Sequence, residues 1–200
     1  MISTPWGYSV DADTLDPIIT AEQFAVITGG MFSASPERVA AVLSGVSAAI
    51  RDYCGWHVAP SLTCVFRGNG EGRLLMLPAM GVSDVASVSI MDSDSTGELL
   101  PANQYEWTAA GMVRLRFGRF PDAWRGVLCE YTAGFDSASL GVVVAQIAGN
   151  ALAASPGVAD ERAGNVSISY NRTGEGITGG VSLLPRDVEL LAPYKLTRAR

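Results

Sequence analysis

Few residues in this chain of 200 residues have types and spacing suited to chemistry. His57 is the single histidine, so any Ser-His-Asp or Cys-His mechanism would have to use it. Cys54 is the thiol nearest to it in the sequence. A histidine beside a tryptophan at the end of a helix is usually packed in a core or capping the helix. We therefore predict a structural His57 and no catalytic residue. A small hydrolase that uses His57 with Cys54 or a nearby serine is the alternative.

The sequence shows no metal-ligating or phosphate-binding pattern. Cys54, Cys64 and Cys129 are odd in number and lack C-x-x-C spacing, which is typical of reduced core thiols. The acidic run over residues 92–98 does not place its glycine and closing glutamate as an EF-hand calcium loop does. The glycine-rich run over residues 68–72 lacks the lysine and the following helix of a phosphate-binding loop. We expect neither a metal nor a cofactor.

The composition limits the classes of partner. The 14 basic and 20 acidic residues give a net charge of −6, which argues against a surface that binds duplex DNA or anionic lipid. Hydrophobic residues make up 48% of the chain, enough for one domain with a substantial core. The first ten residues lack the pattern of a signal peptide, and no apolar run is long enough to span a bilayer. We expect a soluble protein made without export and without a membrane partner.

The longest predicted element is a helix over residues 36–53. Its apolar residues recur every three or four positions and form one stripe of Val39, Leu43, Val46, Ile50 and Tyr53. Pro36 suits the first turn of this helix, and Gly55 ends it. Small residues, which permit close approach of another backbone, occupy the opposite face: Ala41, Ser44, Gly45, Ser47 and Ala48. We predict that this face packs against another surface.

The remaining elements predict an α+β fold. Thr20 and Gln23 form the capping box of a short helix over residues 21–28. Between residues 62 and 132, apolar residues recur at every second position, which predicts an antiparallel sheet of five or six short strands. Hairpin turns are predicted at residues 68–72 and 109–111. Helical spacing returns over residues 137–155 and again over residues 184–191. The predicted fold packs a helical part, two N-terminal helices and the helix near 137–155, with this sheet.

The two ends of the chain differ from its middle. Residues 1–19 carry acidic residues, no basic residue and no periodic pattern, which predicts an acidic extended arm. Residues 20–170 are predicted to form a single α+β domain. Residues 171–200 comprise a glycine-rich loop, the short helix and a basic C-terminal tail. The sequence therefore predicts flexible N- and C-terminal arms around one domain.

Several aromatic residues lie at or near the ends of predicted elements, where large rings fill the join between helices and a sheet. They are Trp56, Trp107, Trp124, Tyr131 and Phe135. We expect most of them in the core and some at contacts with a partner, where aromatic anchors dominate the binding energy. The sequence does not separate the two groups.

Four stretches of the sequence together resemble a known family. They are ITAEQF at residues 19–24, YCGWHVAP at 53–60, YTAGF at 131–135 and ERAGNVSISY at 161–170. In this order they resemble the head-to-tail adaptor, or head-tail connector, proteins of long-tailed bacteriophages over about residues 18–196. The stretches are structural and contain no active-site signature. The acidic residues 1–19 depart from the compact starts of that family.

The resemblance implies a structural virion protein that catalyses no reaction. Members of the adaptor family form a ring, generally of twelve subunits, beneath the portal after DNA has been packaged. The ring extends the DNA channel and is the docking platform for the next neck or tail protein during head completion. The implied partners are copies of the same chain, the portal and that downstream protein, while packaged DNA passes without sequence-specific binding. The implied location is the head-tail connector region of the virion, after synthesis in the bacterial host cytoplasm.

The resemblance also implies contact residues. Contact with the portal would be made by the C-terminal residues Tyr194, Lys195, Arg198 and Arg200. Contact between neighbouring subunits would be made on the small-residue helix face by Ala41, Ser44 and Ala48. Another neck or tail-completion protein, such as a stopper or a tail terminator, is the alternative function in the same setting.

Overall fold

The chain divides into two compact units, which are described separately. The computed structural model describes residues 1–32, 35–91, 97–153, 160–163, 166–169 and 183–196. The first unit, called the sheet unit, consists of Met1–Leu15 and Gly55–Asp136, together with Leu196. The second, called the helical unit, consists of Asp16–Cys54 and Ser137–Lys195.

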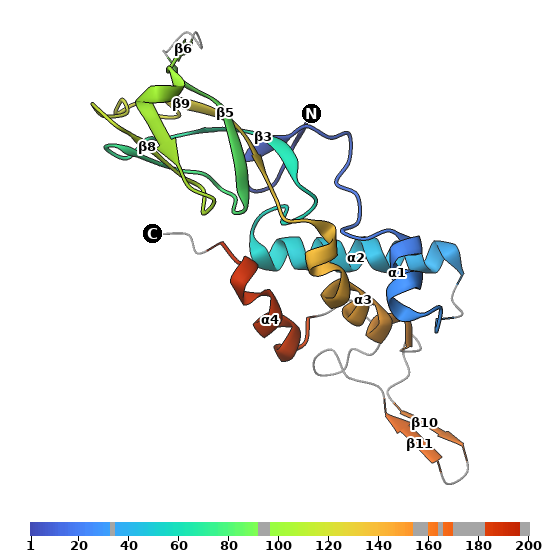
Figure 1. The fold of residues 1–200 in the computed structure, drawn as a ribbon. Helices are drawn as coiled ribbons and strands as arrows, with labels where there is room; N and C mark the ends of the chain where they lie inside the picture. Colours follow the sequence, from blue (N-terminus) through green and yellow to red (C-terminus); the bar gives the residue numbers. More distant parts are fainter. Residues whose placement is uncertain (33–34, 92–96, 154–159, 164–165, 170–182, 197–200) are drawn as a thin grey trace. The chain divides into compact units, whose positions relative to one another are not determined.

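A six-stranded antiparallel sheet forms the larger part of the sheet unit (Figure 1). In spatial order its strands are β1 (Ile2–Ser3), β2 (Tyr8–Val10), β3 (Leu62–Gly68), β9 (Val127–Ala133), β5 (Val82–Met91) and β6 (Gly97–Leu99). Strand β9 is central, because it pairs with β3 over its whole length and with β5 on its other side. Every second residue of β9 is buried, so one face of the sheet carries the core.

A three-stranded antiparallel sheet completes this unit. Its order is β4 (Leu74–Met76), β8 (Met112–Leu115) and β7 (Tyr105–Trp107), and the 3-10 turn η1 (Ala102–Gln104) precedes β7. Leu75 and Val113 face the core. The β7–β8 hairpin turns at Gly111, whose φ of 84° lies in the left-handed region that glycine adopts readily. The hairpin predicted here is confirmed.

Helices α1 (Ala21–Thr28), α2 (Pro36–Cys54) and α3 (Ser137–Ala153) pack against one another in the helical unit. Helix α4 (Pro185–Leu191) contacts α3 and continues into the 3-10 turn η2 (Ala192–Tyr194). A hairpin of β10 (Asp160–Ala163) and β11 (Val166–Ser169) belongs to the same unit. Most of the apolar stripe predicted for α2 is buried, with Val46 and Ile50 fully enclosed, whereas Tyr53 is half-buried. Among the described helices, none is both long enough and apolar enough to cross a membrane.

Helix α1 begins and ends where the sequence predicts. The Thr20 backbone N–H donates to Gln23 Oε1 at 2.8 Å, and the Gln23 N–H donates to Thr20 Oγ1 at 3.2 Å. These reciprocal bonds are the predicted capping box. Gly29, with φ of 62°, ends the helix in a left-handed conformation.

The structure confirms the α+β class and the antiparallel sheet, but the strands around residues 68–72 pair differently from the prediction. Strand β3 pairs with β2 and β9, whereas β4 pairs with β8 in the other sheet. The glycine-rich run therefore connects two sheets and is not a hairpin turn between neighbours. Alternation along a strand shows which face is buried, and it does not identify the partner strand.

Residues 1–19 also differ from the predicted extended arm. Strands β1 and β2 pair with each other, and β2 extends the six-stranded sheet beside β3. Farther along, the Ile18 N–H donates to Ser47 Oγ at 2.9 Å, and Arg51 Nη2 donates to the Asp16 carbonyl at 2.7 Å. Strands of two and three residues are too short to show a period, so only tertiary contacts reveal them.

Candidate functional site

His57 is buried, and both of its ring nitrogens have partners. Its Nε2 lies 2.9 Å from the Ala133 carbonyl oxygen, which can only accept, so we assign the ring hydrogen to this nitrogen. Its Nδ1 lies 2.7 Å from Tyr8 Oη, and its backbone N–H donates to the same hydroxyl at 3.0 Å. The imidazole therefore joins β2 to β9, and neither nitrogen is open to take a proton from a nucleophile.

The cysteines are buried thiols. Burial raises the pKa of Cys54, Cys64 and Cys129 from the ordinary value of 9.0 to about 12. A thiol with such a pKa is protonated at neutral pH and is a poor nucleophile. Cys54 and His57 therefore lack the features that the hydrolase alternative requires. Within the described ranges, no three histidine, cysteine or acidic side chains gather as metal ligands would.

The small-residue face of α2 is open to contact. Three residues expected at subunit contacts are exposed: Ala41, Ser44 and Ala48. Ser47 belongs instead to the buried side of the helix, where it accepts the Ile18 N–H and donates to the Leu43 carbonyl at 2.7 Å. The exposed face is therefore narrower than the sequence predicts.

The C-terminal segment begins with a helix that is anchored in the helical unit. Leu191 of α4 is fully buried. Lys195 Nζ lies 4.6 Å from the centre of the Tyr53 ring on α2, a cation–π contact. Of the residues expected at the portal, Tyr194 is half-buried and Lys195 is exposed, whereas Arg198 and Arg200 lie outside the described residues.

Helices α1 and α3 leave an apolar groove between them, with a volume of about 390 Å³. Its apolar lining consists of Ile19, Val26, Ile27, Ala138, Gly141 and Val142. At Gly141 the helices approach closely, because an added Cβ would lie 3.2 Å from Ile27 Cδ1. Val26 is 82% exposed and Val142 is 66% exposed, so a large part of the apolar surface of the groove faces solvent. Glu22 is the one charged residue among those that line it.

The loop over residues 116–126 joins β8 to β9, and the fold holds its start and its middle in place. At the start, the Arg116 N–H donates to the Gln104 carbonyl at 2.8 Å. In the middle, Phe120 is buried, and its N–H donates to the Gly72 carbonyl at 2.7 Å. Phe120 therefore turns inward and anchors the loop to the connection between the two sheets.

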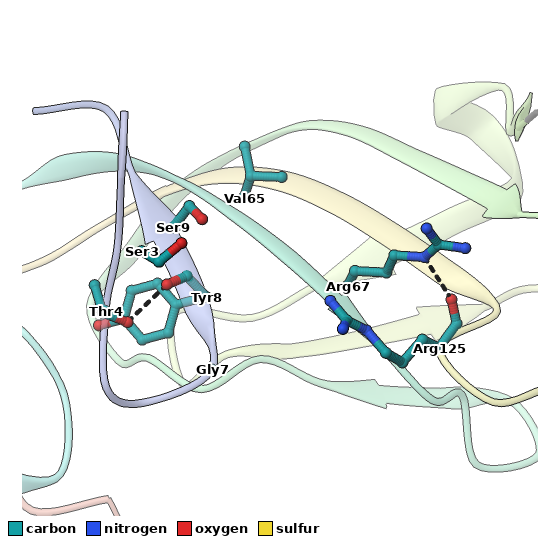
Figure 2. Close-up of a pocket in the computed structure, with 8 residues that line it drawn as sticks. All are labelled: Ser3, Thr4, Gly7, Tyr8, Ser9, Val65, Arg67 and Arg125. Carbon is teal, nitrogen blue, oxygen red and sulfur yellow. Dashed lines mark hydrogen bonds between the residues drawn. The ribbon is translucent and has the colours of Figure 1, made fainter. Parts of the chain in front are cut away.

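The end of the loop is held around Arg125. The Arg125 N–H donates to Asn69 Oδ1 at 2.6 Å. The Arg125 carbonyl accepts from Arg67 Nε at 3.0 Å (Figure 2). The φ of Arg125 is 54°, a left-handed conformation that is rare for residues other than glycine. Such a conformation costs on the order of 1 kcal/mol, and it persists where surrounding bonds enforce it.

Two large aromatic side chains project from this anchored loop. Trp124 is 84% exposed and Phe117 is 83% exposed. Exposed aromatic side chains on a fixed loop are typical of protein interfaces. The loop is also basic within an acidic chain, since its charged residues are Arg116, Arg119, Asp122 and Arg125.

A polar pocket of about 360 Å³ lies beside the same loop. Figure 2 shows Ser3 and Ser9 on the β1–β2 hairpin at one side of it, and Arg67 and Arg125 at the other. Hydroxyl and guanidinium groups favour an anionic or hydrogen-bond-accepting group. Arginine does not lose its proton in proteins, so these side chains supply binding groups and no acid–base pair.

The sequence indicates some of these surface residues and not others. It leaves open whether Trp124 lies in the core or at a contact, and the structure exposes Trp124 while it buries Trp56. Val26 and Val142 were missed because valine in a helix is expected to face the core. The helical spacing does indicate that Val26 is exposed. Val26 follows the buried Phe24 by two residues, which places it about 200° around the helix, on the opposite side.

Comparison with known proteins relates this fold to particle necks. No family model matches the sequence, and no curated protein matches it. The fold is similar to that of a chain in the neck of an empty gene transfer agent (GTA) particle computed with C6 symmetry, with a TM-score of 0.57 at 14% identity. A chain in the neck of the native GTA particle computed with C12 symmetry matches with a TM-score of 0.55 at 16% sequence identity. A chain in the virion of the native particle matches with a TM-score of 0.57 at 15% sequence identity. Each match covers 96% of this chain and 97% of the other chain, so nearly the whole chain has the fold of a protein from the neck of a GTA particle.

Proposed function

We propose that this chain is a head-to-tail adaptor, a structural virion protein that forms a ring beneath the portal. The ring extends the DNA channel and provides the docking platform for the next neck or tail protein during head completion. The observation that carries the proposal is the fold shared with chains of GTA particles over 96% of this chain. The four sequence stretches that resemble phage adaptors support it independently.

The symmetry of those necks supports a ring. They were computed with C12 and C6 symmetry, and both are cyclic. A cyclic ring of more than two subunits has a heterologous interface, so each subunit needs two different contact surfaces. We assign the exposed face of α2 around Ala41, Ser44 and Ala48 to contact between subunits.

The charge distribution supports the roles of channel and portal contact. A net charge of −6 suits a conduit through which DNA slides, because a strongly basic wall would hold the phosphates. The C-terminal end carries Lys195, Arg198 and Arg200 without an acidic residue. A basic tail on an acidic chain suits an acidic partner surface, and we assign Tyr194 and this tail to contact with the portal.

Co-sedimentation of the purified chain with portal rings, and separately with tails, of the same particle tests the role. Binding to the portal and not to isolated tails supports the adaptor function. Binding to isolated tails alone would make the chain a tail terminator or another tail-completion protein. Binding to neither would contradict a role in the neck.

A further inference from the structure

We infer that the α1–α3 groove of one copy binds Trp124 from the neighbouring copy. The inference rests on the proposed ring and adds one pair of contacting surfaces to the α2 face already assigned to contact between subunits. Because a ring interface is heterologous, each copy must present a receiving surface and a different, projecting one. The groove of the helical unit is the receiving surface, and the loop over residues 116–126 is the projecting one.

The groove has the chemistry that an aromatic ring requires. Its walls are apolar, and Val26 and Val142 remain largely in water until another surface covers them. Gly141 has no side chain, so Ile27 of α1 packs directly against α3 at this position and lines the groove with it. A flat apolar side chain entering between α1 and α3 would remove these surfaces from water together.

Trp124 has the properties of an anchor. It is 84% exposed, although the bonds of Phe120 and Arg125 hold the loop on both sides of it. A loop that is already ordered loses little conformational entropy when it binds. Tryptophan is also among the residues that contribute most to binding when they are buried at the centre of an interface.

Charge favours this loop as the occupant of the groove. The loop around Trp124 is basic on balance, because its three arginines, Arg116, Arg119 and Arg125, outnumber its one acidic residue, Asp122. Glu22, the charged residue of the groove, is exposed beside the apolar walls. Entry of the loop would bring opposite charges together, which strengthens association at low salt and selects this orientation over others.

Cross-linking of cysteine variants in the assembled ring tests this pairing. Ala123→Cys places a thiol beside Trp124, and Ala138→Cys places one in the groove, while the natural thiols are buried. A mixture of the two variants, tagged to differ in mass, should give a disulfide-linked pair. Leu99→Cys in place of Ala123→Cys is the matched control, because Leu99 is an exposed residue of β6 that lies outside both the groove and the loop. Leu99→Cys should form no disulfide with Ala138→Cys.

Adding Trp124→Ser to the Ala123→Cys variant should abolish the cross-link or the ring itself, whereas Leu99→Ser should leave both intact. Circular dichroism is the control that tests whether each variant is folded. A ring that forms without the cross-link, or with a cross-link that Trp124→Ser leaves unchanged, would overturn this docking and leave the proposed function standing. Failure of the chain to form a ring either alone or with the portal would overturn both.

Discussion

Tyr8 and His57 form a buried pair that fixes the N-terminal strands in the sheet unit. The Tyr8 hydroxyl lies 2.7 Å from His57 Nδ1 and accepts the His57 backbone N–H at 3.0 Å. The pair joins residues 49 positions apart in the sequence. The one histidine that could have served catalysis therefore holds β2 against the rest of the unit.

Tyr8→Phe should destabilise the chain by about 1–3 kcal/mol, because Nδ1 and the backbone N–H of His57 then lose a buried partner. Urea unfolding followed by tryptophan fluorescence measures the change. Tyr53→Phe is the matched control, since the Tyr53 hydroxyl donates to the Val188 carbonyl at 3.4 Å in a part-buried position. Equal losses in the two variants would contradict a special role for the Tyr8–His57 pair.

The buried thiols should make the chain less stable at alkaline pH. The pKa of Cys54, Cys64 and Cys129 is about 12 in the folded chain against an ordinary 9.0, so between pH 9 and pH 12 the unfolded state binds fewer protons than the folded state. The contribution of these thiols to stability is complete below pH 9 and is lost as the pH rises toward 12. Denaturation at a series of pH values measures this fall. A Cys129→Ala variant should show a shallower fall, and an unchanged slope would contradict the prediction.

Substitution of Arg125 separates backbone strain from side-chain contacts. Arg125→Gly should change the free energy of unfolding by less than about 1 kcal/mol, because glycine accepts the positive φ. Arg125→Val should cost about 1–3 kcal/mol, because a β-branched residue resists that conformation. Urea midpoints of the two variants provide the comparison. If glycine costs as much as valine, the side chain of Arg125 and not its backbone stabilises the loop.

The sequence predicts the local elements better than their partners. The capping box of Thr20 and Gln23 and the spacing of Val46 and Ile50 are short-range signals, and α1 and α2 form where these signals predict. Strand pairing depends on residues far apart in the sequence. Val65 lies opposite Ser9 on one side and opposite Glu130 on the other, and no local sequence pattern predicts either contact. The two short N-terminal strands depend on such contacts alone.

The same distinction holds for the candidate contact surfaces. Exposure of Ala48 follows from the helical period that buries Val46 and Ile50 on the other side of α2. Exposure of Trp124 depends on Phe120, because Phe120 is buried and fixes the course of the loop. The sequence does not show which aromatic residue of this loop faces the core.

Ala48→Arg should prevent ring formation and leave the fold intact, because Ala48 is exposed on α2 and a long charged side chain blocks close helix packing. Ring formation is measured by negative-stain electron microscopy, and folding by circular dichroism. Ala48→Ser keeps the small size and should assemble normally. If Ala48→Arg forms rings as well as the natural chain does, this face of α2 is not part of the subunit interface.

Truncation after Lys195 should weaken binding to the portal without changing the free energy of unfolding. It removes Arg198 and Arg200 but retains α4, whose Leu191 is part of the core and would be lost in a longer truncation. A full-length variant with Arg198→Lys and Arg200→Lys keeps the charge and should bind as the natural chain does. Full binding by the truncated chain would exclude the last residues from the portal contact.

Cryo-electron microscopy of the portal mixed with this chain tests the central claim most directly. The adaptor function predicts a closed ring of this chain stacked on the portal, with the channel continuing through both. The same map would show whether the C-terminal end of each copy reaches the portal. A bare portal, with the chain bound instead to tails or tubes, would contradict the claim.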